Sequence, residues 1–313
     1  MRTEFSEIIS VAIFAGVIVA IYAIEAYLIL DFVGSRRRGQ GVPKLFWSRR
    51  AILVHLFAAA GAVCILYGYF IEPYWIDVKK VEIPTVKLHQ TAIRLVQISD
   101  LHCSMRPGNE KKLVELVNSV EPDVVVFTGD AVNTPKALPL FKETLKSINA
   151  RLGKFAVRGN IDIMFLSGKD IFGGTGFQEL DGNSIELQKG GEAFYISGLN
   201  CVHPVEPDKL LGGIPKDCFS IFLYHYSDLV EDLQHLDVDL YLCGHTHGGQ
   251  VVLPFYGALV TLSKFGKKYE AGEYAVGSTV LYVNRGIGMA GGFAPKVRFL
   301  ARPEITIFEI KPK

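Results

Sequence analysis

The fold is decided by the stretch Ala92-Ile-Arg-Leu-Val-Gln-Ile-Ser-Asp-Leu-His102, a β-rich run that ends in two polar residues. Its apolar and β-branched residues predict a strand that stops at Asp100. In extended chain, side chains two residues apart point to the same side, so Asp100 and His102 can direct two donor atoms into one pocket. An open α/β sheet places its ligand crevice at such strand ends, so further site residues are expected at the ends of other strands.

The segments after this run alternate between strand-like and helix-like patterns. Helical spacing of apolar residues is found in 109–120 and 136–150, and buried strands are expected at 123–128 and 154–157. This βαβα rhythm predicts an α/β sheet whose strands are covered on both faces.

The second half is richer in strands. Six further strands are expected, at 193–198, 220–224, 238–243, 250–253, 279–283 and 305–310. The glycine-rich segment 172–191 and the long segment 257–277, which is basic in its middle, are expected to be loops.

Five polar clusters fall at the ends of predicted strands: Asp100-Leu-His102, Gly129-Asp130, Gly159-Asn160, His225 and Gly244-His-Thr-His247. The glycines allow the tight backbone that turns a side chain off a strand end into a cavity. Carboxylate and imidazole donors suit a first-row divalent ion, and seven donors fit two ions that share a ligand. A lone histidine or a Gly-Asp pair is more often structural, so the prediction rests on the five clusters together; His203 and His235 receive no role from it.

In order, these clusters resemble the motifs of the calcineurin-like metallophosphoesterases, D-x-H, G-D, G-N-H-D/E, a lone H and G-H-x-H. Here they read DLH, GD, GNID, YHYSD and GHTH over residues 100–247, and 248–251 and 283–288 resemble the membrane-anchored bacterial branch. The resemblance implies an α/β fold, a four-layer αββα sandwich with two divalent metal ions between its sheets.

The resemblance also implies a ligand set. It consists of Asp100, His102 and His247 for one ion, Asn160, His225 and His245 for the other, and Asp130 as the bridge. A hydroxide that bridges the ions would attack the phosphorus while the ions neutralise the phosphoryl oxygens. Mn²⁺ is favoured, and Zn²⁺ and Fe²⁺ suit the same ligands.

One position departs from the family's motif. The histidine of G-N-H-D is credited in the family with helping the leaving group or the phosphate, and Ile161 stands at its place. Three consequences stay open: the leaving group is acidic enough to need no proton, Arg158 or His203 substitutes, or the protein binds metal without turnover. Family members that cleave UDP-diacylglucosamine have a G-N-R-D motif, so the departure is compatible with activity. Four residues are the catalytic candidates: Asp130, Asn160, Arg158 and Asp162.

The N-terminal region differs in composition from the rest of the 313-residue chain, 49% of which is hydrophobic. Residues 8–30 are apolar except for Ser10, Glu25 and a few small residues, and 51–71 carry no formal charge. Each segment reaches the ~20 residues that a helix needs to cross a bilayer core. We therefore expect a transmembrane hairpin in residues 1–72 ahead of a phosphoesterase domain in 81–313, rather than a buried hairpin or a removed signal peptide.

The connection between the two segments is basic. After Asp31 it has no acid and six basic residues: Arg36, Arg37, Arg38, Lys44, Arg49 and Arg50. Such an excess predicts a cytoplasmic loop in an inner or cell membrane, with the catalytic domain on the extracytoplasmic side. Tyr74 and Trp75 would then lie in the interfacial aromatic belt.

Glu25 and His55 are expected at similar depth in this hairpin, about one helical turn inside its cytoplasmic end. Snorkelling of the two side chains toward the headgroups is favoured over a functional ionic or proton site. The matched depth nevertheless suggests the hypothesis that the two side chains touch.

Cysteines and net charge exclude some classes of protein. The five cysteines form no C-x-x-C pair and are widely spaced, so buried free thiols are expected rather than a disulfide framework. The formal net charge is +1, so nothing suggests nucleic acid as a partner.

The leading interpretation is a membrane-anchored dinuclear-metal phosphoesterase acting on a phosphorylated substrate. Tethering suggests a lipid-linked phosphate or diphosphate, with apolar residues around 255–256 and 288–293 available to contact acyl chains. One alternative is a UDP-2,3-diacylglucosamine diphosphatase of lipid A synthesis, whose nucleotide substrate is cytoplasmic and conflicts with the expected topology. An alternative of another class is a non-catalytic membrane scaffold that keeps its metals for structure.

Overall fold

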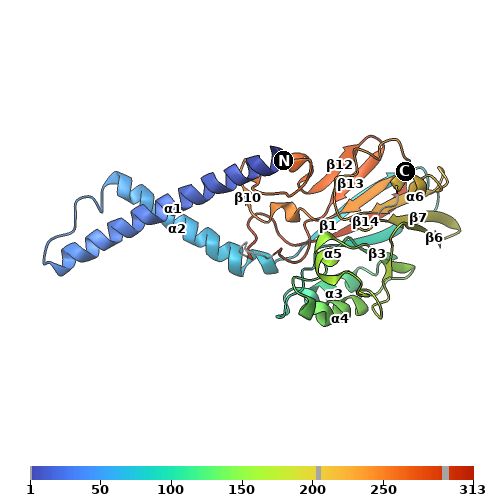
Figure 1. The fold of residues 1–313 in the computed structure, drawn as a ribbon, viewed down its shortest axis with the longest axis horizontal. Helices are drawn as coiled ribbons and strands as arrows, with labels where there is room; N and C mark the ends of the chain where they lie inside the picture. Colours follow the sequence, from blue (N-terminus) through green and yellow to red (C-terminus); the bar gives the residue numbers. More distant parts are fainter. Residues whose placement is uncertain (1, 202–205, 291–295) are drawn as a thin grey trace. The chain divides into compact units, whose positions relative to one another are not determined.

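The computed structural model describes residues 2–201, 206–290 and 296–313, and the chain divides into two compact units, Met1–Ile71 and Glu72–Lys313 (Figure 1). The first unit consists of two helices, α1 (Arg2–Arg37) and α2 (Arg49–Phe70). Both are long and apolar enough to cross a membrane, and only 6% and 17% of their most apolar windows are buried. A core helix of a soluble protein would be mostly buried, so this exposure favours the membrane interpretation over a buried hairpin.

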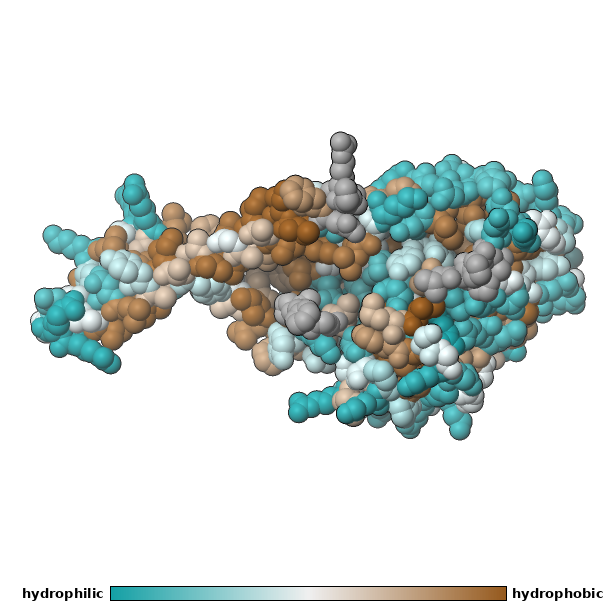
Figure 2. Space-filling model, in the orientation of Figure 1, coloured by the Kyte–Doolittle hydropathy of each residue, from teal (hydrophilic) through white to brown (hydrophobic). Residues whose placement is uncertain are grey.

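Hydrophobic residues run along both helices in Figure 2, and hydrophilic residues gather at the connection between them. The start of α2 is capped by Ser48, whose side chain accepts the backbone N–H of Ala51 at 3.2 Å. The cap satisfies one of the amides that a helix leaves unpaired at its start.

One polar pair joins the two helices. His55 Nδ1 lies 2.6 Å from Glu25 Oε2, and His55 Nε2 lies 3.1 Å from the carbonyl oxygen of Phe46. The hypothesis that Glu25 and His55 touch is confirmed. A second tie is the hydrogen bond that the Tyr22 hydroxyl donates to the Ala58 carbonyl at 3.1 Å.

The second unit begins with a short 3₁₀ turn, η1 (Glu72–Tyr74), and contains two six-stranded sheets. The first sheet has the order β1 (Asp77–Thr85), β14 (Glu304–Pro312), β2 (Ile93–Ile98), β3 (Val124–Phe127), β4 (Gly153–Ala156) and β5 (Gln178–Glu179). Neighbouring strands in this sheet are parallel, except that β14 and β2 are antiparallel. Leu95 of β2 lies opposite Phe308 of β14 on one side and opposite Val124 of β3 on the other.

The second sheet has the order β12 (Gly272–Val276), β13 (Thr279–Val283), β9 (Leu240–Cys243), β8 (Phe219–Leu223), β7 (Glu192–Gly198) and β6 (Asn183–Lys189). Its four central strands are parallel, and the edge strands β12 and β6 are antiparallel to their neighbours. A separate two-residue pairing joins β10 (Val252–Leu253) to β11 (Gly257–Ala258).

The two sheets pack face to face through one apolar core. Val126 and Phe155 from the first sheet and Ile221 and Leu240 from the second belong to the same buried cluster. Two amphipathic helices, α3 (Glu110–Ser119) and α4 (Leu138–Lys146, after the 3₁₀ turn η2 at Pro135–Ala137), cover the outer face of the first sheet (Figure 1).

The outer face of the second sheet is covered by a thinner layer. It is built by the five-residue helix α6 (Pro207–Leu211), by Val230 and Leu233 from a run of turns, and by Tyr269 from the 3₁₀ turn η4 (Gly266–Tyr269). The expected four-layer αββα sandwich is confirmed, and turns rather than long helices form most of the layer that covers the second sheet.

The sequence-based predictions failed mainly at sheet edges. The segment 172–191 is not a loop throughout, because β5 and β6 lie in it, and 257–277 contains β11, η4 and β12. The expected strand at 250–253 shrinks to the two residues of β10, and β1 was not expected at all. These edge strands are half-exposed and carry charged residues, so they lack the apolar run that marks a buried strand.

The cysteines are free, as expected. Burial was expected for all of them but holds only for Cys103 and Cys243, since Cys64 is exposed and Cys201 and Cys218 are partly exposed. The unexpected exposure of Cys64 follows from its position on the apolar surface of α2.

The Glu25–His55 contact predicts energetic coupling in the first unit. A double-mutant cycle with Glu25→Ala and His55→Ala should give a coupling free energy of about 0.5–2 kcal/mol, since the cycle isolates the pair term. The measurement is reversible unfolding in detergent micelles. A cycle that pairs Glu25→Ala with Cys64→Ala is the control, and its two effects should be additive. Zero coupling in the cycle of Glu25 and His55 would contradict a stabilising contact between them.

Candidate metal centre

The residues of the five polar clusters follow the carboxyl ends of strands in both sheets. Asp100 and His102 follow β2, Asp130 follows β3, and Asn160 opens the short helix α5 (Asn160–Leu166) after β4. From the second sheet, His225 follows β8, and the pair His245 and His247 follows β9, with His247 opening the 3₁₀ turn η3 (His247–Gly249). The two sheets thus deliver their polar residues to one edge of the sandwich.

Unusual backbone conformations turn these side chains off their strands. Left-handed φ angles occur at five of the seven predicted ligands: Asp100 (49°), His102 (42°), Asp130 (62°), His245 (70°) and His247 (52°). Such conformations cost about 1–3 kcal/mol each in a residue with a side chain and persist where the surroundings over-determine them. Here backbone hydrogen bonds between neighbouring turns hold these conformations: Asp100 N–H donates to the Gly129 carbonyl (2.8 Å), and His102 N–H donates to the Asp130 carbonyl (3.1 Å).

A glycine is required at position 244 because the side chains of Ser99 and Asp100 approach its backbone closely, and not because of its φ angle. A Cβ at this position would lie 2.1 Å from Ser99 Oγ and 2.2 Å from Asp100 Oδ2. The glycine before the two histidines therefore lets the β9 turn reach the carboxylate from the other sheet.

Three buried side chains form the first metal-binding group: Asp100, His102 and His247. His247 Nε2 lies 3.4 Å from Asp100 Oδ1, and the two Nε2 atoms of His102 and His247 lie 3.1 Å apart. Imidazole nitrogens that face each other and a carboxylate oxygen form the kind of donor set that a divalent ion binds.

The second group consists of Asp130, His225 and His245. His225 Nε2 lies 3.4 Å from Asp130 Oδ2 and 3.1 Å from Asn160 Oδ1, so Asn160 borders this group. The same Asp130 Oδ2 lies 3.6 Å from His102 Nε2 of the first group. One carboxylate oxygen thus faces an imidazole of each group.

Backbone carbonyls fix which nitrogen of two histidines faces the site. His225 Nδ1 lies 2.7 Å from the carbonyl oxygen of Thr128, and His245 Nε2 lies 3.2 Å from that of Leu262. A carbonyl accepts an N–H, so in the neutral form of either imidazole the other ring nitrogen carries the lone pair that a metal-ligating histidine requires. His245 also packs edge-on against the ring of Tyr226, with 4.4 Å between centroids.

Burial sets the protonation of three imidazoles. It lowers the pKa of His102 and of His245 to about 4, and it holds the pKa of His247 well below its usual range. These rings are neutral near pH 7, which is the form that binds a metal ion.

His225 and Asp130 form a charge pair instead. Burial disfavours charge on both, but the carboxylates of Asp130 and Asp100 raise the pKa of His225 to about 10, and the charge of His225 lowers the pKa of Asp130. Burial, reinforced by Asp130, raises the pKa of Asp100 to about 6. The carboxylates of Asp100 and Asp130 lie close together, and the proton on His225 offsets part of their negative charge. A bound cation could take over this role, so the charges suit a cation at this place.

Asp162 touches backbone amides. Its carboxylate accepts N–H bonds from Asp130 (2.8 Å), Ala131 (2.8 Å) and Gly159 (3.0 Å). Burial, followed by the charge of Asp130, raises the pKa of Asp162 to about 7. With no histidine beside it to orient, Asp162 acts as a positioning residue that ties the Gly-Asp turn to the Gly-Asn turn.

Ile161 and Arg158 each donate a hydrogen bond to an acidic side chain. The backbone N–H of Ile161 donates to Asp130 Oδ1 at 2.9 Å, so the substituted position still holds the shared carboxylate. The Arg158 guanidinium pairs with Glu179 at 2.6 and 2.9 Å and donates to two carbonyls near the end of α5. These bonds occupy the guanidinium, and the substitution of Arg158 for the missing histidine, one of the three open alternatives, stays a prediction. His203 lies outside the described residues.

Sequence reasoning missed a buried chain of hydrogen bonds behind Asp100. Gln97 Nε2 donates to Thr128 Oγ1 (3.1 Å), Thr128 Oγ1 donates to Ser99 Oγ (2.7 Å), and Ser99 Oγ donates to Asp100 Oδ2 (2.5 Å). Gln97 also donates to the Cys243 carbonyl of the other sheet at 2.9 Å. The polar residues Gln97, near the end of β2, and Ser99, directly after it, were the signal that could have revealed it.

A fully buried arginine supports the first group from behind. Arg298 donates to the carbonyl oxygens of Ala301 (2.8 Å), Arg285 (2.9 Å) and Gly286 (3.2 Å), and its Nη2 lies 3.4 Å from His247 Nδ1. Burial lowers its pKa to about 9. Carbonyl oxygens satisfy this guanidinium, and its position fixes the loop after β13 against His247.

The bonds of Asp162 predict a large cost for removing its charge. Asp162→Asn should lower the free energy of unfolding by about 2–4 kcal/mol, because an amide offers one acceptor oxygen and turns donors toward buried N–H groups. Chemical denaturation of the metal-free protein measures the effect. Asp232→Asn, at an exposed carboxylate, is the matched control. A loss no larger than that of the control would contradict the positioning role.

Comparison with known proteins places the chain in a family. The calcineurin-like phosphoesterase family matches residues 93–249. The uncharacterised metallophosphoesterase YkuE of Bacillus subtilis is 34% identical over 295 residues, which cover 84% of this chain and 98% of YkuE.

Two further relatives have names that state an activity. The UDP-2,3-diacylglucosamine pyrophosphatase LpxG of Chlamydia trachomatis is 27% identical over 317 residues, with 80% of this chain and 93% of LpxG covered. The phosphodiesterase YaeI of Escherichia coli is 27% identical over 256 residues, with 78% of this chain and 92% of YaeI covered. The chain belongs to the calcineurin-like phosphoesterases and is a metal-dependent hydrolase of phosphoesters.

Proposed function

We propose that this protein is a membrane-anchored phosphoesterase that uses two divalent metal ions to hydrolyse a phosphoester or diphosphate bond of a lipid-linked substrate. The position of Asp130 Oδ2 carries the proposal. It lies 3.4 Å from His225 Nε2 and 3.6 Å from His102 Nε2, so one carboxylate is in reach of both donor groups. A shared carboxylate is what two adjacent ions need.

The proposed ligands are those that the motifs suggested. They are Asp100, His102 and His247 for one ion, Asn160, His225 and His245 for the other, and Asp130 for both. When bound, the ions would activate a water molecule and neutralise the oxygens of the phosphoryl group. Oxygen and imidazole donors suit Mn²⁺, which we favour, and also Zn²⁺ and Fe²⁺.

The chain's own residues keep these donors in place. Ser99 Oγ and the backbone N–H of His245 both donate to Asp100 Oδ2, and the backbone N–H of Ile161 donates to Asp130. Asp162 fixes the turns that carry Asp130 and Asn160. Because the donors are held before substrate binds, little reorganisation is needed at the moment of reaction.

The leaving group is the second part of the proposal. Ile161 offers no proton donor where the family has a histidine, and Arg158 is engaged by Glu179. A leaving group that departs without a proton, such as a phosphate or a nucleotide, fits this site better than an alkoxide. Asp130 and Asn160 remain the catalytic candidates among the four suggested by sequence.

Membrane anchoring rests on the first unit. Two exposed apolar helices, with the basic connection between them, support a transmembrane hairpin in residues 1–72 and an extracytoplasmic phosphoesterase domain in 81–313. A domain held at the bilayer meets lipid-linked phosphates at high local concentration. The name of the relative LpxG, whose substrate carries acyl chains, supports such a substrate class.

A UDP-2,3-diacylglucosamine diphosphatase remains the alternative within the class, favoured by the name of LpxG and by the absence of the motif's histidine. Its nucleotide substrate is cytoplasmic, whereas the basic connection favours an outer domain. A reporter enzyme fused after Lys313 decides: activity restricted to the cytoplasm would support this alternative and contradict our topology.

The metal site predicts hydrolysis of an artificial diester. With Mn²⁺, the full-length protein in detergent should hydrolyse bis(p-nitrophenyl) phosphate, and Asp130→Ala should lower kcat/KM by roughly 10³-fold or more because both ions lose a ligand. Asp232→Asn, an exposed acid, should retain activity. Absence of hydrolysis by the unaltered protein would favour the alternative of a non-catalytic scaffold.

The leaving-group argument predicts a graded effect of restoring the histidine. Ile161→His should raise kcat/KM most for phosphate esters of poor leaving groups, since an imidazole there can protonate the departing oxygen. A series of aryl phosphates with leaving groups of rising pKa measures the slope for both proteins. An equal or negative effect along the whole series would count against the argument.

A further inference from the structure

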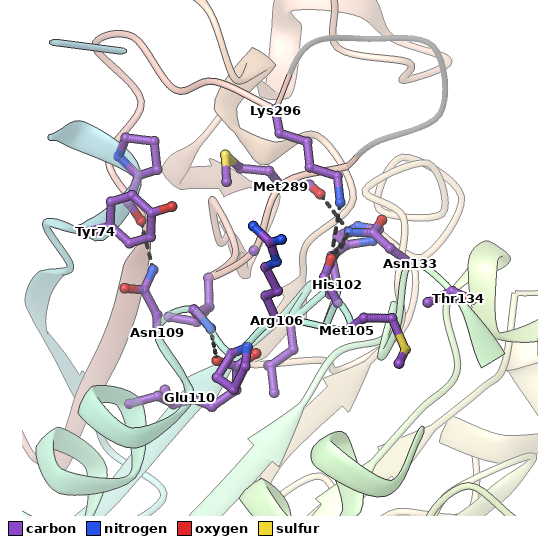
Figure 3. A pocket seen from close by; sticks show the side chains of 18 residues that line it. Tyr74, His102, Met105, Arg106, Asn109, Glu110, Asn133, Thr134, Met289 and Lys296 are labelled. Carbon is purple, nitrogen blue, oxygen red and sulfur yellow. Dashed lines mark hydrogen bonds between the residues drawn. The ribbon is translucent and has the colours of Figure 1, made fainter. Parts of the chain in front are cut away.

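A cavity of about 530 Å³ opens beside the first metal-binding group (Figure 3). Its wall includes Leu101 and His102 from the turn after β2, Asn133 from the turn after β3, and Gly288 from the loop after β13. His102 is one of the proposed metal ligands. A substrate whose phosphoryl group binds at the metal site can therefore extend into this cavity.

Two cations face the cavity, Arg106 and Lys296. Lys296 Nζ donates to Ser104 Oγ at 3.0 Å, whereas no hydrogen bond or ion pair within the described ranges engages the Arg106 guanidinium, which stands in the middle of the cavity in Figure 3. Glu110 is the one acid among the lining residues, and its Oε2 accepts the backbone N–H of Gly108. The lining thus keeps donors and positive charge available for an anion.

The remaining walls are largely apolar. They are formed by Leu101, Leu113, Ile287, Met105, Met289 and Pro73. Leu101 and Leu113 are buried, while Met105 is 63% exposed and its flexible side chain can adapt to an occupant. A small inorganic anion would leave these walls unused, so the lining suits a ligand that carries an apolar chain as well as a negative charge.

We infer that this cavity binds the leaving half of the substrate, a phosphate that bears an apolar chain, and that Arg106 and Lys296 are its specificity-determining residues. The inference rests on the proposed function and narrows its substrate to diphosphates with an alkyl or acyl-bearing end. Arg106 and Lys296 would bind the second phosphate while the first lies at the metal ligands.

This assignment accounts for the missing histidine. In diphosphate hydrolysis the oxygen of a water molecule bonds to the first phosphorus, and the P–O bond to the second phosphate breaks. The departing phosphate takes the bonding electrons, and the proton of the water passes to solvent. Two cations beside the departing oxygens stabilise their charge, so no side chain at position 161 has to donate a proton.

The inference is tested with the full-length protein in detergent and Mn²⁺, using Arg106→Gln, Lys296→Gln and the double variant. The substrates are decyl diphosphate, which has a second phosphate, and bis(p-nitrophenyl) phosphate, which does not. The double variant should lose roughly 10- to 100-fold in kcat/KM for decyl diphosphate, through kcat as well as KM, because the charged hydrogen bonds that bind the second phosphate and stabilise its departing charge are lost. For the diester it should stay within about twofold.

A matched control is Lys111→Gln. Lys111 is an exposed cation of α3 that pairs with Glu115 and does not line the cavity. It should change neither substrate's kcat/KM. If the control lowers decyl diphosphate hydrolysis as much as the double variant does, the effect is one of general surface charge and the inference is overturned.

A binding measurement separates this inference from the proposed function. Titration calorimetry with decyl methylenediphosphonate, whose P–C–P bridge resists hydrolysis, should show a Kd weakened by roughly 3- to 10-fold in the double variant, because the ground-state contacts of the second phosphate are lost. Equal binding by the unaltered protein and the double variant overturns the inference, whether or not the diester is hydrolysed. Failure to hydrolyse the diester, with the expected difference in binding, contradicts the proposed function and leaves the anion site supported.

Discussion

The contact of one carboxylate oxygen with two imidazoles is the constraint on which the rest of the site depends. Asp130 Oδ2 can face His102 and His225 together only if turns from both sheets end at the same place. The left-handed backbone of Asp130 turns its side chain off β3, and the Asp162 carboxylate holds the amide of Asp130 in that turn. The apolar core between the sheets makes the surrounding structure rigid, and this rigidity keeps the strained turns in place.

The central strands could be predicted from the sequence, but the contacts that hold the candidate ligands in place could not. Short motifs after apolar runs indicated seven candidate ligands, because strand ends and glycines are local features, and the structure brings six of them into two groups with Asn160 beside the second. The hydrogen bond from Ser99 to Asp100, the carbonyl that orients His245 and the engagement of Arg158 by Glu179 depend on residues far apart in the chain. Edge strands such as β1 and β6 were missed because exposed, charged strands lack a buried strand's pattern.

The departure at position 161 and the cavity beside His102 fit a single chemical account. Ile161 removes a proton donor and keeps only its backbone N–H on Asp130, while Arg106 and Lys296 add positive charge where a leaving group would depart. A site of this kind favours leaving groups that are already anionic. The apolar walls of the cavity and the exposed apolar helices of the first unit agree with a substrate that resides in a bilayer.

Counting metal ions tests the central claim most directly. The purified protein is loaded with Mn²⁺, freed of excess ion and assayed for manganese per chain, beside Asp130→Ala treated in the same way. The account predicts two ions per chain in the unaltered protein and at most one in the variant, because Asp130 would serve both ions. A single ion in the unaltered protein, or two retained after Asp130 is removed, would contradict a dinuclear site built around this carboxylate.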